Sequence, residues 1–250
     1  MLSASNIPTP TKHNDYSEPT TILLLPSFII VENVTPDRVP ELITSIINTS
    51  PTNTDPLTSS TKELMAASSA MPDEVPISVP TALPDPLPTA GEMISRPSPH
   101  SAIILLCSQK TRDARCGQSA PLLKKEFDRH LRHMGLYRDF SDERPGGVGI
   151  YFISHVGGHK YSANLMVYRR PDPFGLDNLE RGKDDEQKFA RPKATADKFE
   201  DGAAQCIWLA RVRPEDCEGI LKFTVLQGKV VKPERQLRGG FDRGRGAISW

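Results

Sequence analysis

Hydrophobic residues gather in two separate parts of the chain, and the first part lies near the N-terminus. Residues 21–32 are dominated by aliphatic side chains and predict a strand. Thr35 and Pro36 are residue types that favour the start of a helix. Apolar residues then recur at helical spacing, at Val39, Leu42, Ile43, Ile46 and Ile47. One strand and one helix are too few for a domain, so we interpret residues 21–47 as the remnant of an N-terminal domain.

The second hydrophobic pattern begins just after residue 100. Residues 102–106 form an uninterrupted apolar run, which is typical of a buried strand. An amphipathic helix follows, with Ser119 as its expected cap, Pro121 in its first turn and Gly135 at its end. Its apolar face consists of Leu123, Phe127, Leu131 and Met134. This part of the chain therefore has the pattern of a folded domain.

Three more strands are predicted, at residues 147–154, 164–168 and 206–212. A last helix is expected to start at Pro214 and to bury Ile220 and Leu221. The resulting order of elements predicts an α/β domain over residues 100–250, built on a small mixed sheet flanked by helices. Within this domain we expect two irregular parts, a mobile charged loop at 171–204 and a flexible tail at 236–250.

Composition sets the remaining boundaries. Of the 23 prolines 16 precede residue 101, whereas 16 of the 17 glycines follow residue 100. Residues 48–99 are rich in Ser, Thr and Pro and contain too little apolar surface to offset the entropy of ordering them. We therefore expect a disordered linker at 48–99 and a disordered segment at 1–20.

Charge is balanced over the whole chain but not within its parts. The 31 basic and 31 acidic side chains cancel, so no global charge recruits nucleic acid or a membrane. Residues 1–100 nevertheless carry 4 Lys/Arg against 11 Asp/Glu, while residues 101–250 carry 27 against 20. No apolar run approaches the ~20 residues that span a bilayer, and residues 1–20 match neither a secretory signal nor a mitochondrial presequence. We expect a cytoplasmic protein, with the nucleus as the alternative.

Four side chains with metal-binding chemistry follow two predicted strands. Cys107 ends the first strand of the second part, and Cys116 comes after a polar loop. His155 and His159 follow the next strand and enclose two glycines, which favour a tight loop over a helix. Two thiols and two imidazoles on neighbouring strand ends form a possible four-ligand set.

The other cysteines and histidines have simpler interpretations. Cys206 and Cys217 fall within strand and helix patterns, where a cysteine behaves as a small buried apolar residue. The remaining histidines are interpreted as surface or core residues: His13, His100, His130 and His133.

The residues alone leave the metal open. Zinc takes sets of two Cys and two His, but its small structural modules space the cysteines by two to four residues, whereas eight residues separate Cys107 from Cys116. No C-x-x-C redox motif is present. Iron-sulfur centres of the Rieske type also use two cysteines and two histidines. Such an oxidised cluster has no net charge, and Lys110, Arg112 and Arg115 would favour adding an electron.

A string of motifs resembles the sucrase/ferredoxin-like family. The matching segments lie within residues 101–226, at 107–117, 137–142, 145–148, 155–164 and 207–212. The resemblance implies a thioredoxin-like ferredoxin domain with a 2Fe-2S cluster held by Cys107, Cys116, His155 and His159. Family members have a fuller N-terminal domain, of which only the final strand and helix are recognisable here, so we expect either a truncated form or a truncated gene model. The charged loop at 171–204 has no recognisable counterpart.

Two features near the C-terminus suggest partners. The sequence from Arg238 to Gly246 resembles a short RGG tract, which can bind single-stranded nucleic acid. Ile248, Ser249 and Trp250 resemble a C-terminal tripeptide through which cytosolic iron-sulfur proteins are recognised by the cluster assembly machinery. We predict an electron-transfer protein with an unidentified redox partner. The alternative is a zinc-stabilised module that binds RNA or protein, and an enzyme with its own substrate is less expected, because no nucleophile and base pair or phosphate loop is present.

Overall fold

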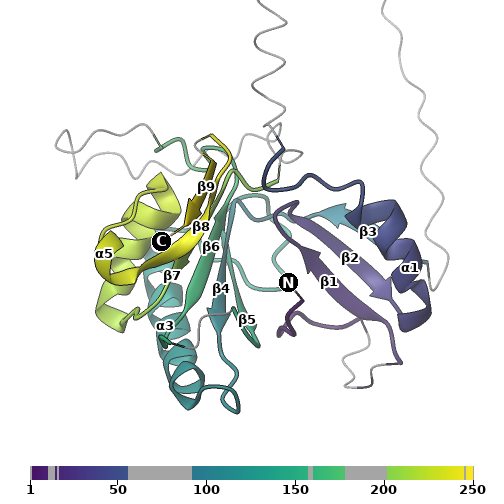
Figure 1. Cartoon of the computed structure of the whole chain (residues 1–250), viewed down its shortest axis with the longest axis horizontal. Coiled ribbons are helices and arrows are strands. Elements are labelled where there is room, and N and C mark those ends of the chain that lie inside the picture. The colour runs from purple at the N-terminus through teal and green to yellow at the C-terminus, as the bar shows by residue number, and fades with distance from the viewer. Residues whose placement is uncertain are drawn as a thin grey trace, which may run out of the picture.

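The structure is a computed structural model, which describes residues 2–10, 15, 17–55, 92–156, 160–177, 202–244 and 246–249. It has a mixed α/β fold with two sheets, one of three strands and one of six, and this confirms the predicted fold class (Figure 1). The predicted linker at 48–99 and the loop at 171–204 lie largely outside the described residues. Within the described residues, no helix is long and apolar enough to cross a membrane.

The smaller sheet is antiparallel and contains three strands in chain order: β1 (Thr20–Leu24), β2 (Ile29–Val34) and β3 (Ile94–Pro97). The prediction of a single strand at 21–32 is wrong, because a turn between the strands makes a hairpin. The prediction that the linker extends to residue 99 is also wrong. The third strand has only four residues and includes a proline, so it gives little periodic signal.

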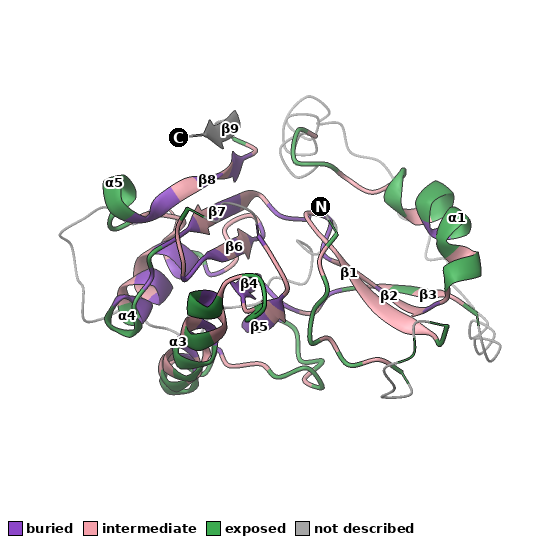
Figure 2. Cartoon of the chain, turned by 60° about the horizontal axis from the view of Figure 1, so that its bottom comes forward, coloured by how far each residue is buried: buried purple, intermediate pink, exposed green. Residues whose placement is uncertain are grey.

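One helical stretch follows the hairpin. It consists of η1 (Pro36–Arg38), α1 (Val39–Glu41) and η2 (Leu42–Ile47), and it confirms the helix predicted from apolar spacing. The side chain of Thr35, the expected cap, makes no capping hydrogen bond. Most of this stretch is exposed (Figure 2), and Leu42 is its only residue that is fully buried.

The N-terminal segment is ordered from residue 2 to residue 10, contrary to the expectation of disorder. It runs antiparallel to β5 (Val148–Ile153), with Ser5 opposite Ile153. The Asn6 amide donates to the Phe152 carbonyl oxygen at 3.3 Å, and the Phe152 amide donates to the Asn6 side chain at 2.8 Å. The segment lacks hydrophobic periodicity, so its order comes from pairing with a strand that is distant in sequence.

The larger sheet has the strand order β5-β4-β6-β7-β8-β9. Strands β4 (Ala102–Cys107) and β5 are parallel, and all other pairs are antiparallel. The next two strands are β6 (Leu165–Arg169) and β7 (Gln205–Leu209). Together with β4 and β5 they have the order and directions expected of a thioredoxin-like sheet.

Two helical elements cover one face of this sheet. They are α3 (Ala114–His133) and the stretch formed by η4 (Pro214–Asp216), α4 (Cys217–Gly219) and η5 (Ile220–Val225). In β4, Ile104 and Leu106 belong to the core on this face, whereas Ile103 and Leu105 belong to the core on the opposite face. Phe28, from the smaller sheet's hairpin, is fully buried in the second core and joins the two sheets.

Two further predictions in this domain are wrong. The first is the position of the cap, because α3 begins at Ala114 with Asp113 as cap and not at Ser119. The second is the flexible tail at 236–250, where the chain instead forms α5 (Pro233–Gln236), β8 (Leu237–Asp242) and β9 (Gly246–Ser249). The RGG-like tract is thus largely part of the sheet. Ile248 and Ser249 lie in β9, and Trp250 lies outside the described residues.

Candidate metal centre

Three of the four predicted ligands lie at one edge of the larger sheet. Cys107 is the last residue of β4, Cys116 is in the first turn of α3, and His155 follows the end of β5. Because β4 and β5 are parallel, their carboxyl ends meet at the same edge. Cys107, Cys116 and His155 line one small pocket there, together with Gln109, Arg112, Asp113, Tyr161 and Asn164.

The loop that carries the cysteines is held by backbone hydrogen bonds and by a helix cap. The Cys107 amide donates to the Asn164 carbonyl oxygen at 3.0 Å, and the Ser108 amide donates to the Ile153 carbonyl oxygen at 2.9 Å. The Asp113 carboxylate accepts from the Arg115 amide at 2.9 Å. The hydrogen bonds that the Arg115 side chain donates to this carboxylate are the first cause that keeps the Asp113 pKa below its usual value. These contacts set the direction in which α3, and with it Cys116, leaves the loop.

The Cys107 thiol lies in a surrounding that keeps it protonated at neutral pH. Burial, followed by the neighbouring Cys116 thiol, raises the pKa of Cys107 to about 11. The backbone amides of Val156 and Gln109 act in the opposite direction, because they donate toward the sulfur and favour a thiolate. A metal that binds here would therefore displace protons, and the amides would then donate to a charged sulfur.

His155 is fixed through its backbone by the N-terminal segment. The hydroxyl of Ser3 donates to the His155 carbonyl oxygen at 3.1 Å and accepts from the His155 amide at 3.2 Å. The same hydroxyl lies 3.0 Å from the Ser154 hydroxyl. This contact could not be predicted from the sequence, because a lone serine in a polar segment has no periodic signal.

The segment beyond the histidine loop is anchored by aromatic and amide contacts. The Asn164 side chain donates to the Tyr161 carbonyl oxygen at 2.5 Å, and the Trp208 indole donates to the Asn164 side chain at 3.3 Å. The guanidinium groups of Arg211 and Arg238 lie over the Tyr161 ring, 4.1 Å and 3.8 Å from its centroid. Residues from three segments, 161–164, 208–211 and the start of β8, therefore fix the pocket wall that Tyr161 forms.

The fourth predicted ligand and the other two cysteines do not belong to this pocket as the structure describes it. His159 lies outside the described residues. Cys206 is buried on the face that holds Phe241, where burial raises its pKa to about 12, and Cys217 is buried against α3. Neither residue lines the pocket of Cys107 and Cys116. Among the described residues, no three His, Cys, Asp or Glu side chains converge as ligands of a metal ion.

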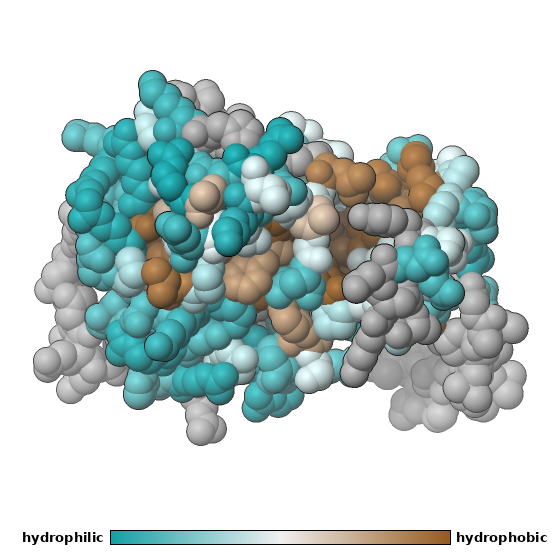
Figure 3. Space-filling model, turned by 90° about the horizontal axis from the view of Figure 1, so that it is seen from below, coloured by the Kyte–Doolittle hydropathy of each residue, from teal (hydrophilic) through white to brown (hydrophobic). Residues whose placement is uncertain are grey.

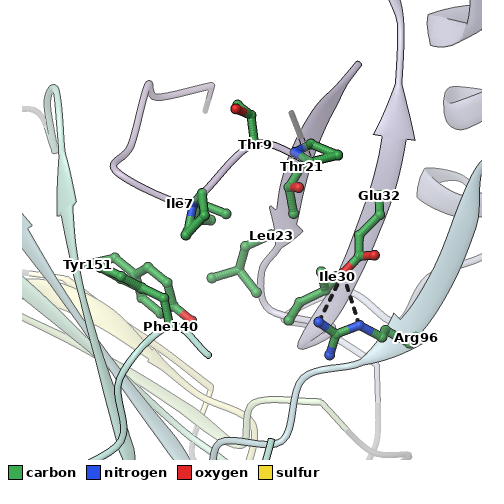
Figure 4. A pocket seen from close by; sticks show the side chains of 11 residues that line it. Ile7, Thr9, Thr21, Leu23, Ile30, Glu32, Arg96, Phe140 and Tyr151 are labelled. Carbon is green, nitrogen blue, oxygen red and sulfur yellow. Dashed lines mark hydrogen bonds and ion pairs between the residues drawn. The ribbon is translucent and has the colours of Figure 1, made fainter. Parts of the chain in front are cut away.

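A larger cavity of about 240 Å³ lies between the smaller sheet and β5 (Figure 4). Leu23 and Ile30 face Phe140 and Tyr151 across it, and its charged side chains, Arg96 and Glu32, are paired at 2.9 Å. No cysteine or histidine lines this cavity. Of these two cavities, only the smaller one is lined by cysteine and histidine side chains.

Sequence reasoning missed several residues that shape this pocket. Asp113 carried a signal, since aspartate is a preferred cap directly before a helical pattern. Tyr161 and Asn164 lie in the matching segment at 155–164, but neither residue type by itself predicts a place in the pocket wall. Arg238 was assigned to a flexible tail, and only the pairing of β8 with β7 brings it to Tyr161.

Comparison with known proteins places this site in a family. The profile of the sucrase/ferredoxin-like family matches residues 1–239. The chain belongs to this family. It is 56% identical over 69 residues to the actin patches distal protein 1 of Saccharomyces cerevisiae, which is 28% of this chain and 22% of that protein.

More distant relatives match a longer part of the chain. The altered inheritance of mitochondria protein 32 of Clavispora lusitaniae is 28% identical over 133 residues, which is 53% of this chain and 33% of that protein. The Debaryomyces hansenii protein of the same name is 29% identical over 130 residues, 52% of this chain and 33% of that protein. The chain thus spans between about a fifth and a third of the length of these relatives. No solved structure matches it significantly.

Proposed function

We propose that this sucrase/ferredoxin-like protein binds one 2Fe-2S cluster and transfers electrons, with Cys107, Cys116, His155 and His159 as ligands. One observation carries the proposal. Two buried thiols and a histidine, from three different elements, line a single pocket at the edge of a thioredoxin-like sheet.

The chemistry of the donor set fits this group. Two thiolates and two imidazoles are the ligand set of Rieske-type clusters. The pocket has a volume of only about 10 Å³, which is room for about one water molecule. Cluster binding therefore requires the loop that carries Cys107 and Cys116 to move away from His155. The loop between the two cysteines, residues 108–113, is largely exposed and can adjust without disrupting the sheet.

The cluster, when bound, supplies one-electron redox chemistry. The chain itself contributes the backbone amides and basic side chains around the proposed cluster site. The Val156 and Gln109 amides donate toward the Cys107 sulfur, which stabilises negative charge there. Exposed Lys110 and Arg112 place positive charge beside the pocket, which favours the reduced state.

The proposal is tested by purifying the protein without oxygen and measuring its absorption spectrum, iron and acid-labile sulfide. We expect coloured protein with about two irons and two sulfides per chain. Cys107→Ser and Cys116→Ser should each abolish the cluster, because each removes a thiolate ligand. Cys206→Ser and Cys217→Ser are the matched controls, since both thiols are buried away from the pocket, and both variants should keep the colour.

Two outcomes would contradict the proposal. A colourless protein with one zinc ion per chain would support the alternative, a zinc-stabilised binding module. Loss of colour in Cys206→Ser as complete as in Cys107→Ser, with the fold retained by circular dichroism, would show that the ligand assignment is wrong.

A further inference from the structure

Basic side chains surround the pocket of Cys107 and Cys116. They come from the cysteine loop, from the start of the segment after the histidine loop, and from the ends of β7 and β8 that meet at the same edge. We call them the basic rim: Lys110, Arg112, Lys160, Arg211 and Arg238. The loop between β4 and α3 lies at the bottom of the larger sheet in Figure 1, and Figure 3 views the molecule from that side. Hydrophilic residues dominate the part of this face that lies under the larger sheet (Figure 3).

The members of the rim share the lack of an acidic partner among the described residues. None of its five members forms an ion pair with a described carboxylate. Elsewhere in the described chain many surface cations are paired, including Arg38 with Glu41, Arg129 with Glu126, Arg144 with Asp142 and Lys222 with Glu218. Positive charge at this edge is thus left for a partner outside the chain.

Two arginines at the centre of the rim, Arg211 and Arg238, adopt energetically unfavourable arrangements. Arg211 has a φ of 57°, a backbone conformation that a residue with a side chain rarely adopts and that is enriched at functional positions. The Nε of Arg238 is buried and has no hydrogen-bond partner among the described residues. Both guanidinium groups stack on the Tyr161 ring, so their charges are fixed beside the pocket rather than free in solvent.

We propose that the basic rim is the docking surface for an acidic electron-transfer protein. This inference rests on the proposed function, because it assumes that the pocket holds a redox centre. Arginine and tyrosine are enriched at the centre of protein interfaces, and an aromatic ring stacked with two guanidinium groups gives a rigid contact there. Complementary charge would bring the partner's redox group to the edge where the thiols lie.

The reaction at this surface is the transfer of one electron. A reduced acidic partner loses the electron, the oxidised cluster of this chain gains it, and no bond forms or breaks. Since rim charges act mainly on association, the rate and the affinity should both depend on ionic strength.

A plant-type ferredoxin, a small acidic 2Fe-2S protein, is the probe. Its dissociation constant for the cluster-loaded protein is measured by calorimetry with both proteins oxidised, at low salt and at 200 mM salt. Lys110→Glu and Lys160→Glu should each weaken binding roughly three- to tenfold at low salt. Lys125→Glu is the matched control, because Lys125 is exposed on α3, about 15 Å along the helix axis from the cysteine loop. This control should leave the affinity unchanged.

The outcomes separate the two proposals. A dissociation constant that neither salt nor the rim variants change, with the cluster present, would overturn the docking surface and leave the proposed function intact. Protein without iron would contradict the proposed function. Tighter binding of a single-stranded uridine oligonucleotide than of the ferredoxin, lost in both rim variants, would assign the rim to nucleic acid instead.

Discussion

The hydroxyl of Ser3 bonds both backbone groups of His155, donating to its carbonyl oxygen and accepting from its amide. The segment of His155, a proposed ligand, is thus held by Ser3, a residue far from it in the sequence. We expect Ser3→Ala to weaken this hold by about 0.5–1.5 kcal/mol, the usual net contribution of a hydrogen bond. The bound cluster should then be lost several-fold faster to a chelator, as followed by the decay of its absorbance.

Ser5→Ala is the control for this experiment. Ser5 lies in the same segment, but among the described residues its hydroxyl accepts only from the Ile7 amide in an exposed turn. Its removal should leave the rate of cluster loss unchanged. Equal effects of the two substitutions would mean that the segment as a whole, and not the Ser3 hydroxyl, stabilises His155.

Gly117 lies directly under the cysteine loop. A Cβ at this position would come within 2.7 Å of the Lys110 Cβ and 2.8 Å of its Cα, and rotation of a side chain cannot relieve contacts with those atoms. Gly117→Ala should therefore lower the free energy of unfolding by about 1–3 kcal/mol, as overpacking does, and should reduce the iron content. Gly219→Ala, in α4, has open space around the added methyl group and should be neutral or stabilising. Urea unfolding of both variants checks this contrast.

An element of this fold could be predicted from the sequence where its pattern involves only residues close to one another in the chain. Strand β4 and the buried face of α3 follow from the spacing of apolar residues, because helix and strand periods act over a few neighbours. Strand β8 could not be found in this way, since Gly239 and Gly240 have low strand propensity. Glycine is needed at position 240 because the Cys206 carbonyl oxygen lies too close to admit a side chain. This contact joins residues that are distant in sequence, so it leaves no local signal.

The same distinction between local patterns and distant contacts applies to the residues of the candidate site. The residue types and their positions near strand ends predicted Cys107, Cys116 and His155 as ligands, and the structure places these three residues around one pocket. The residues that fix them, Ser3 and Tyr161, act through contacts between segments that are far apart in the chain. Such contacts leave no periodic pattern, and only the sheet order brings them together.

The lowered pKa of His100 predicts how the free energy of unfolding depends on pH. Burial, followed by the nearby charge of Arg138, lowers the pKa of His100 to about 4. Its ring is packed against Gly149, and its Nε2 lies 3.0 Å from the Tyr151 hydroxyl oxygen. The folded protein therefore holds a neutral imidazole, whereas the unfolded chain binds a proton near pH 6.5.

The direction of the pH dependence follows from this difference between the His100 pKa in the folded protein and in the unfolded chain. The stabilising contribution of neutral His100 is fully present above about pH 6.5 and is lost as the pH falls toward 4, by about 3 kcal/mol at most. In His100→Gln, the free energy of unfolding measured in urea between pH 7 and pH 4 should fall less steeply than in the parent protein. His133→Gln, at an exposed position, should keep the parent slope. A slope unchanged in His100→Gln would show that this imidazole is not the group that titrates.

Asp113 and Ser119 give competing positions for the start of α3. In the structure, the Asp113 carboxylate accepts from the Arg115 amide, while the Ser119 hydroxyl donates to the Cys116 carbonyl oxygen from within the helix. Asp113→Ala should therefore lower the free energy of unfolding by about 1 kcal/mol, and Asp113→Asn, which can still cap, should restore most of it. Ser119→Ala should change it little, because alanine favours a helix interior. The reverse ranking in urea unfolding would mean that the helix begins at Ser119, and Cys116 would then lie in the loop.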